Sequence, residues 1–197
     1  VMHIEPLFPI GLLVHDVPDK VADKVEQFVI SRLDKMPSRD GPAPHSTDYF
    51  ESEKIIADLP KELPELWLEF RSCKDAYQQG NNFKAINRQL KTNKNEFEYW
   101  CQDYYEGDIH AEHEHGIGRI SGIYWVRANE YAGGIMFKTP NPFTEYSQDY
   151  NPDAVFSWVG NIYKPTKGRI LMFPSYLKHQ VLPSEKDVER TTIAFNF

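Results

Sequence analysis

The second half of the chain is a series of short apolar runs, rich in β-branched and aromatic residues, that glycine, proline and asparagine separate. Short strands at such regular intervals are typical of a β-sandwich or a β-barrel. This half therefore predicts two sheets that face each other or one sheet closed on itself. The predicted strands cover 119–126, 132–137, 155–159, 168–173, 179–182 and 191–197.

The first half has helical periodicity instead. Apolar residues recur three and four positions apart in two stretches, 21–33 and 63–77, and the second stretch is expected to end near Gly80. Asp16 or Asp19 is expected to cap the first helix, and Pro18 suits its first turn. The segment 81–95 fits a helix or a loop. The apolar residues of the two helices are Val21, Val25, Phe28, Val29 and Leu33, then Leu63, Leu66, Trp67, Phe70, Cys73 and Tyr77.

Helices followed by strands predict the α+β class. With 197 residues, 41% of them hydrophobic, the chain suits one domain with a substantial core. We expect 1–100 to be mostly helical support and 101–197 to form the β structure that carries the site. The only cysteines, Cys73 and Cys101, lie in apolar surroundings and are expected to be reduced core thiols.

Charge and hydropathy exclude several classes of partner. A net charge of −7 argues against a nucleic-acid backbone, because phosphate binding requires clustered Lys and Arg. No apolar run is long enough to span a membrane, and residues 1–9 lack the layout of a signal peptide. The two reduced cysteines indicate a cytoplasmic protein. The expected partner is an unidentified small-molecule or peptide substrate, and an exposed edge strand would allow a homodimer.

Histidines cluster immediately before the first predicted strand, at His110, His113 and His115. On an extended segment, residues i and i+2 point to the same side, so His113 and His115 can direct two imidazoles at one point. His110 and Glu112 form the same kind of pair in the other register. The motif alone fits a metal site or a solvated polar cluster.

A third ligand has to come from a distant segment, and His179 is the candidate. It follows the predicted strand 168–173 after a short turn, and it can close a triad if that strand neighbours 119–126. Imidazole suits iron, zinc, copper and nickel.

Arg190 opens the last predicted strand, and Thr192 shares its side. An arginine at this place is either paired at the surface or functional. A guanidinium forms two parallel hydrogen bonds with a carboxylate, which suits a dicarboxylate co-substrate. Thr192 is placed to add a hydroxyl to the same carboxylate.

Five motifs in this order resemble the 2-oxoglutarate/Fe(II) oxygenase family of marine bacteria and their phages, and more broadly the prolyl-hydroxylase-like enzymes. The similarity covers about residues 97–197. The motifs are HxH at 113–115, SGIYWV at 121–126, GGIMF at 133–137, GRILMFPSYLKH at 168–179 and RTTIAFNF at 190–197.

The resemblance implies a double-stranded β-helix, or jelly roll, with Fe(II) held by His113, His115 and His179. His115 stands where the family usually has a carboxylate. The alternative is that His110 and Glu112 are the true pair, which restores a carboxylate, and the HxH spacing favours His115.

The resemblance also implies that Arg190 binds the C5 carboxylate of 2-oxoglutarate. Tyr124 or Trp125 would line the co-substrate pocket, depending on the strand register. Trp100 and Tyr104 are interpreted as core aromatics rather than as a substrate wall.

These residues predict a 2-oxoglutarate- and Fe(II)-dependent dioxygenase that hydroxylates a substrate and releases succinate and CO2. One alternative is a cupin-like three-histidine metalloenzyme without 2-oxoglutarate. Another is a jelly-roll binding module with no activity. The segment 139–152 suits an ordinary connection or a lid over the site.

Overall fold

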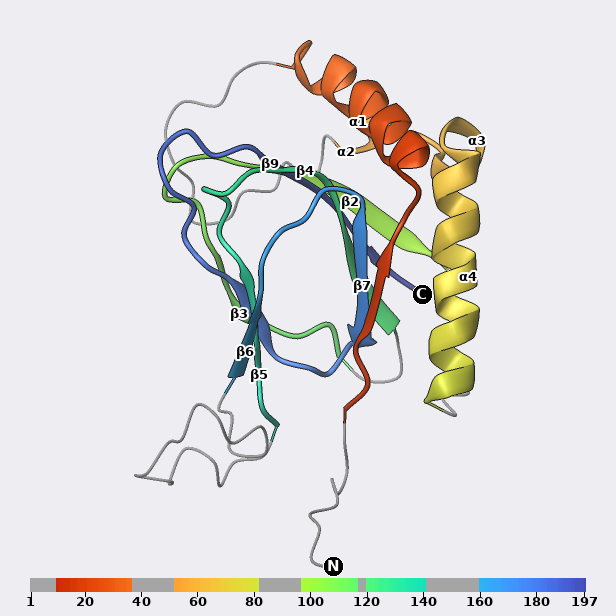
Figure 1. The fold of residues 1–197 in the computed structure, drawn as a ribbon, viewed down its shortest axis with the longest axis vertical. Coiled ribbons are helices and arrows are strands. Elements are labelled where there is room, and N and C mark those ends of the chain that lie inside the picture. The colour runs from red at the N-terminus through yellow and green to blue at the C-terminus, as the bar shows by residue number, and fades with distance from the viewer. Residues whose placement is uncertain (1–9, 37–51, 82–96, 117–119, 141–159) are drawn as a thin grey trace, which may run out of the picture.

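The computed structural model describes residues 10–36, 52–81, 97–116, 120–140 and 160–197. Two antiparallel sheets face each other, and the helices cover the outer face of one of them (Figure 1). The predicted α+β class is confirmed. None of the helices in these residues has the length and apolarity that crossing a membrane requires.

The helices precede all but one of the strands along the chain. They are α1 (Asp19–Leu33), α2 (Ser52–Ile55), α3 (Leu59–Glu62) and α4 (Pro64–Gly80). The strands are β1 (Leu13–Asp16), β2 (Glu98–Tyr104), β3 (His110–His113), β4 (Ile120–Ala128), β5 (Ile135–Lys138), β6 (Gly160–Tyr163), β7 (Arg169–Pro174), β8 (His179–Val181) and β9 (Arg190–Asn196).

The strands form a five-stranded sheet of order β1-β7-β4-β9-β2 and a four-stranded sheet of order β3-β8-β5-β6. From β2 onward the chain passes repeatedly between the two sheets, which is the winding of a double-stranded β-helix. Neighbours in both sheets are antiparallel, and β4 pairs with β7 on one side and β9 on the other. The jelly roll implied by the resemblance is confirmed.

The five-stranded sheet is buried on both faces, which explains why β4 is almost uniformly apolar. Its outer face packs against the buried stripe of α4, where the Phe70 and Phe195 rings stack with centroids 4.3 Å apart. Gly122 allows this packing, because a Cβ there would lie 2.2 Å from the Phe195 ring. Four of the six predicted apolar residues are buried within α4, Leu63 is buried at its N-cap, and Trp67 is partly buried against the same core. The four are Leu66, Phe70, Cys73 and Tyr77.

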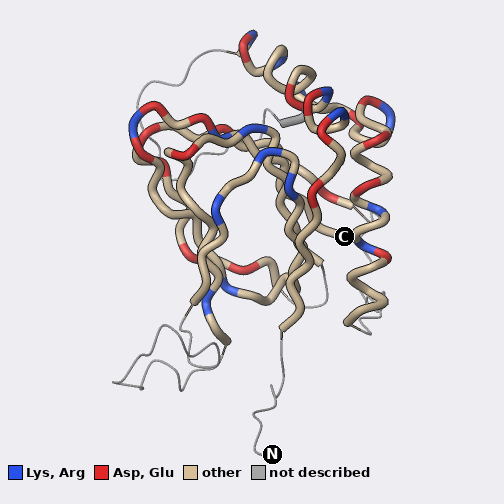
Figure 2. Tube along the Cα trace, in the orientation of Figure 1, with Lys and Arg blue, Asp and Glu red and all other residues tan. Residues whose placement is uncertain are grey.

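A second apolar cluster lies between the sheets and includes Trp125, Leu171 and Phe173 from one sheet and Ile135 and Phe137 from the other. The four-stranded sheet has one covered face, so burial alternates along β5. Figure 2 shows Lys, Arg, Asp and Glu mainly on the helices and on the connections between strands. The strands therefore supply the core and the interior site, while most of the charged residues lie at the periphery and Arg190 is a buried exception.

Several sequence expectations need correction. Pro18, not Asp16 or Asp19, is the N-cap of α1; Asp16 instead binds Arg169, and Asp19 begins the helix. The first half also contributes strand β1 to the sheet, and β2 begins at Glu98, before the expected boundary at 101.

Other expectations were confirmed or fall elsewhere. Cys73 and Cys101 are buried thiols that form no disulfide with each other, and burial raises the pKa of each thiol to about 12. Most of the segments 81–95 and 139–152, and all of the predicted strand 155–159, lie outside the described residues.

Candidate metal centre

Three histidine side chains converge, and one of them, His179, lies against Phe137 and Phe173 of the cluster between the sheets. The ligand atoms of His113, His115 and His179 all lie within 4.8 Å of one another. Ring centroids are 4.3 Å apart for His113 and His179, and 5.1 Å apart for His113 and His115. Metal–nitrogen bonds of about 2.1 Å place two ligand atoms at most about 4.2 Å apart, so small side-chain adjustments bring the three to one ion.

The sheet register explains why His113 and His179 meet. They are direct cross-strand partners on β3 and β8. The condition stated for His179 also holds, because β7 lies beside β4 and the following turn leads into β8.

His115 reaches the same place for a different reason than expected. Strand β3 ends at His113, and a bulge interrupts its register between His110 and His113. The backbone N–H of His115 donates instead to the carbonyl of Ser175, 2.8 Å away. Gly116 then turns the chain with φ +83°. The two imidazoles do converge, but a regular strand is not what aligns them.

Main-chain carbonyls orient two of the rings. The Nδ1 atom of His113 lies 2.8 Å from the carbonyl oxygen of Ala111, and that of His179 lies 2.8 Å from the carbonyl of Leu177. A carbonyl only accepts, so each Nδ1 carries the proton and each Nε2 is left as a lone-pair donor. Burial, together with the nearby His113, lowers the pKa of His179 to about 3 and keeps it in the neutral form that binds metals.

Glu112, the alternative carboxylate ligand, is paired with lysine side chains and not with the histidine group. Glu112 forms an ion pair with Lys138 at 2.5 Å and lies 3.9 Å from Lys178, and the Lys138 hydrogen bond lowers the pKa of its carboxyl. Its proposed partner His110 stacks on His113, with ring centroids 4.1 Å apart. Within the described residues, the group that meets the distance criterion for a metal contains the three histidines and not Glu112.

Arg190 lies in the same inter-sheet space and is fully buried. It links β9 to the segment just before β5, because Nη1 donates to the carbonyl of Gly133 at 2.8 Å, and the guanidinium lies 4.1 Å from the ring centroid of Tyr104 on the neighbouring β2. Its Nε and Nη2 atoms have no hydrogen-bond partner among the described residues. Burial lowers the pKa of this guanidinium, since no described carboxylate offsets the loss of hydration.

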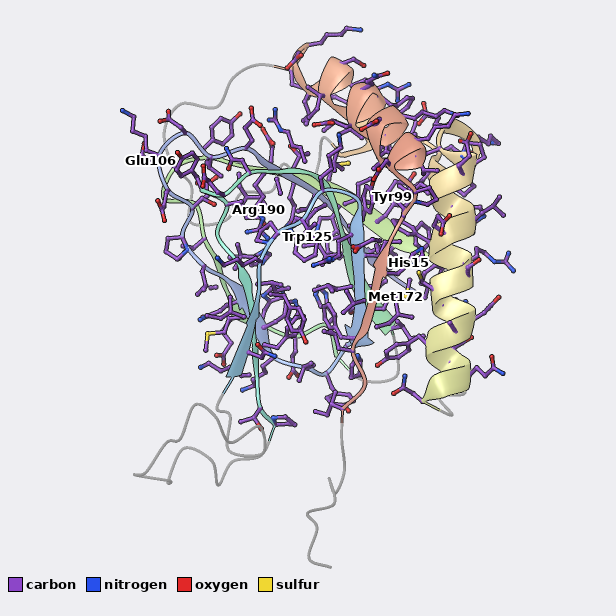
Figure 3. The ribbon with its side chains drawn as sticks, viewed as in Figure 1. His15, Tyr99, Glu106, Trp125, Met172 and Arg190 are labelled. Atoms are coloured by element: carbon purple, nitrogen blue, oxygen red, sulfur yellow. The ribbon has the colours of Figure 1, made fainter. Side chains whose placement is uncertain are left out.

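The register decides between the two aromatic candidates. Trp125 belongs to the inter-sheet cluster, and its Nε1 is another buried donor without a partner among the described residues. Figure 3 shows Trp125 and Arg190 between the two sheets. Tyr124 faces the helices, 6.1 Å from the Phe70 ring, so its assignment to the co-substrate pocket is wrong.

Thr192 shares the face of Arg190, as expected, and its hydroxyl lies 3.3 Å from Oε1 of Gln102. Trp100 and Tyr104 are both buried, as the core interpretation required. Both also border the site, because the Trp100 ring lies 5.9 Å from that of His115.

Gly133 is a site residue that the sequence interpretation did not identify. A Cβ at this position would lie 1.9 Å from the carbonyl oxygen of Leu182, so the close approach requires glycine. This approach positions the carbonyl that binds Arg190. The Gly-Gly pair at 133–134 was the available signal.

A family model described as "Putative 2OG-Fe(II) oxygenase" matches residues 98–196, from the first residue of β2 to the last residue of β9. In fold, the chain is similar to a prolyl-4-hydroxylase of Pseudomonas putida, with 15% identity and a TM-score of 0.60 over 95% of this chain and 92% of that one.

A prolyl hydroxylase of Trichoplax adhaerens, solved with a peptide fragment of the hypoxia inducible factor oxygen degradation domain, is also similar. Identity is 15% and the TM-score 0.52, over 95% of this chain and 83% of that one. At such identities the similarity establishes the fold alone. None of the curated proteins matches the chain in sequence.

Proposed function

Because the chain belongs to the 2OG-Fe(II) oxygenase family, we propose that it hydroxylates a C–H bond of its substrate and releases succinate and CO2. The family is one of oxidoreductases that use Fe(II) and 2-oxoglutarate. When bound, these two groups and O2 supply the oxidising chemistry: one oxygen atom enters succinate as CO2 leaves, and the other enters the substrate. Membership disfavours a binding module without activity.

The residues present fit the metal. His113, His115 and His179 would hold Fe(II) through imidazole nitrogens, and imidazole is a common ligand of iron. Two of the rings already carry the second hydrogen bond that fixes ring orientation. Three neutral ligands leave open positions for a chelating co-substrate.

One observation supports 2-oxoglutarate in particular: the buried donors of Arg190. Two of its N–H groups, and the indole N–H of Trp125, are buried without acceptors in the described residues. A buried cation with free donors is costly unless an anion meets it. We propose that the far carboxylate of 2-oxoglutarate accepts from Arg190 and Trp125.

The test is an anaerobic titration of the purified protein with Fe(II) and then with 2-oxoglutarate. We expect a visible charge-transfer band that needs both additions and is absent from His179→Ala. A metal that binds at the histidines without this band would favour the cupin-like enzyme, which has no use for a dicarboxylate clamp. Succinate release with candidate small molecules and peptides then identifies the substrate.

A further inference from the structure

The turn between β7 and β8 contacts two of the three histidines through its main chain. Within this turn, which we call the 174–178 turn, the carbonyl of Ser175 accepts from the N–H of His115 at 2.8 Å. The carbonyl of Leu177 lies 2.8 Å from Nδ1 of His179. A hydrogen bond from the Leu177 N–H to the Pro174 carbonyl, at 2.9 Å, closes the turn. The place of the turn therefore sets both the backbone at His115 and the ring of His179.

A buried chain of polar side chains fastens this turn to the sheet. The Ser175 and Ser121 hydroxyl oxygens are 2.8 Å apart, and that of Ser121 lies 2.7 Å from Oδ1 of Asn196. An amide oxygen only accepts, so Ser121 donates to Asn196 and Ser175 donates to Ser121. Ser121 and Asn196 are cross-strand partners on β4 and β9, and all three residues are buried.

We propose that Ser121, Ser175 and Asn196 are positioning residues that hold His115 and His179 in the metal-binding arrangement by way of the 174–178 turn. This inference rests on the proposed function of the three histidines. A fully connected buried network of this kind fixes one arrangement of the backbone. A packed apolar substitute would fill the same space without fixing the turn.

The expected consequence is a loss of preorganisation. Without the Ser121 hydroxyl, Ser175 loses its acceptor and Asn196 its donor, so the side-chain link from the turn to β4 and β9 is lost. The turn then keeps its backbone contacts, which include the pairing of Pro174 with Ile120 and the Lys138 N–H bond to the Lys178 carbonyl. Two ligands then depend on a segment that can move. Removing a group that orients a ligand typically weakens metal binding by about 10- to 100-fold.

The test uses Co(II), whose visible d–d bands report the number and geometry of its ligands. The proteins are the wild type, Ser121→Ala and Thr191→Val, a matched loss of a buried β9 hydroxyl. Thr191 binds Asp103 at 2.5 Å and its strand position places it on the helix-facing side. Thermal unfolding of the metal-free proteins measures the purely structural cost of each change.

We expect Ser121→Ala to bind Co(II) about tenfold more weakly and with an altered d–d spectrum, while Thr191→Val keeps both wild-type values. An unchanged affinity and spectrum in Ser121→Ala would overturn the inference. If Ser121→Ala does not fold, Ser175→Ala removes one link of the chain, and the same two outcomes decide. If His179→Ala binds Co(II) like the wild type, the proposed metal site itself is wrong. That outcome differs from a failure of the positioning inference alone.

Discussion

The two faces of the five-stranded sheet differ in kind, although the same strands make both. On β9, Ile193 and Phe195 face the helices in the apolar core, and Phe195 stacks on Phe70. Arg190 and Thr192 face the opposite sheet. Because side chains alternate across a sheet, successive residues of β9 lie alternately in the apolar core and in the space between the sheets.

The faces also differ in how well their groups are satisfied. The outer face buries mainly apolar rings, and the Tyr124 hydroxyl is its one buried side-chain polar atom without a hydrogen-bond partner among the described residues. The inner face buries Arg190 and Trp125 with donors that lack acceptors among the described residues. Unsatisfied buried groups cost stability, and such costs concentrate where a ligand binds. Changes on the outer face should therefore reduce stability, and changes on the inner face should reduce binding.

The largest loss of function is expected from His179→Ala. This removes the buried member of the histidine group, which lies on β8 as the direct cross-strand partner of His113. Orienting groups cost about 10- to 100-fold in metal affinity, so the loss of a ligand should exceed that range. Equilibrium dialysis with iron analysis measures the affinity. If His179→Ala keeps its fold and binds iron like the wild type, the histidine group is not the metal site.

The largest loss of stability is expected from Phe70→Ala on α4. The ring is fully buried against Phe195 and Tyr124, and truncating such a ring costs about 3 to 5 kcal/mol. For a chain of this size, that lowers Tm by about 10 °C. Calorimetry gives the shift, and dialysis on the folded protein should give wild-type metal affinity. A parallel loss of metal affinity would show that the two faces are not separable.

Arg190→Met should have the opposite effect to Phe70→Ala: it should weaken binding and leave the stability unchanged. It removes a buried cation that has no described acidic partner, but also the donor to the Gly133 carbonyl, so the two effects offset and the metal-free protein should unfold near the wild-type temperature. The affinity for 2-oxoglutarate should fall about 100-fold, because the carboxylate loses a charge-assisted, bidentate partner. Calorimetric titration of metal-loaded protein measures this, with Arg190→Lys as the control that keeps the charge. Destabilisation with unchanged 2-oxoglutarate affinity would assign Arg190 a structural role instead.

This difference between the faces also explains what the sequence could predict. Helix α4 was predictable from Leu66, Phe70, Cys73 and Tyr77, because one apolar stripe covers one apolar face. The three histidines were predictable as a group, because few residue types serve as metal ligands. Strand β1 was missed because only four residues form it, with alternating burial at the sheet edge.

Details of register were not predictable. Tyr124 and Trp125 are neighbours on a strand buried on both faces, so an alternating polar pattern that would orient them is missing. A bulge beside Trp125 and another between His110 and His113 shift the pairing by one residue. No sequence pattern predicts either bulge. The convergence of His115 likewise depends on a hydrogen bond to Ser175, from a segment 60 residues away along the chain.

The smallest effect is expected from Glu112→Gln, immediately beside the site. Glu112 is paired with Lys138 at the periphery and lies outside the histidine group, so its loss removes a surface ion pair. Iron content, 2-oxoglutarate affinity and Tm should all match the wild type, and the Lys138→Gln control should match them as well. The same carboxylate was the alternative to His115 as a ligand. If iron affinity falls in Glu112→Gln but not in Lys138→Gln, and His115→Ala retains its full iron content, then Glu112 and not His115 is the ligand. A carboxylate would then belong to the site on the inner face. Unchanged iron binding in Glu112→Gln would instead support a centre of three neutral imidazoles. The positive charge of Fe(II) would then be balanced by the ligands that bind to the ion, not by the protein.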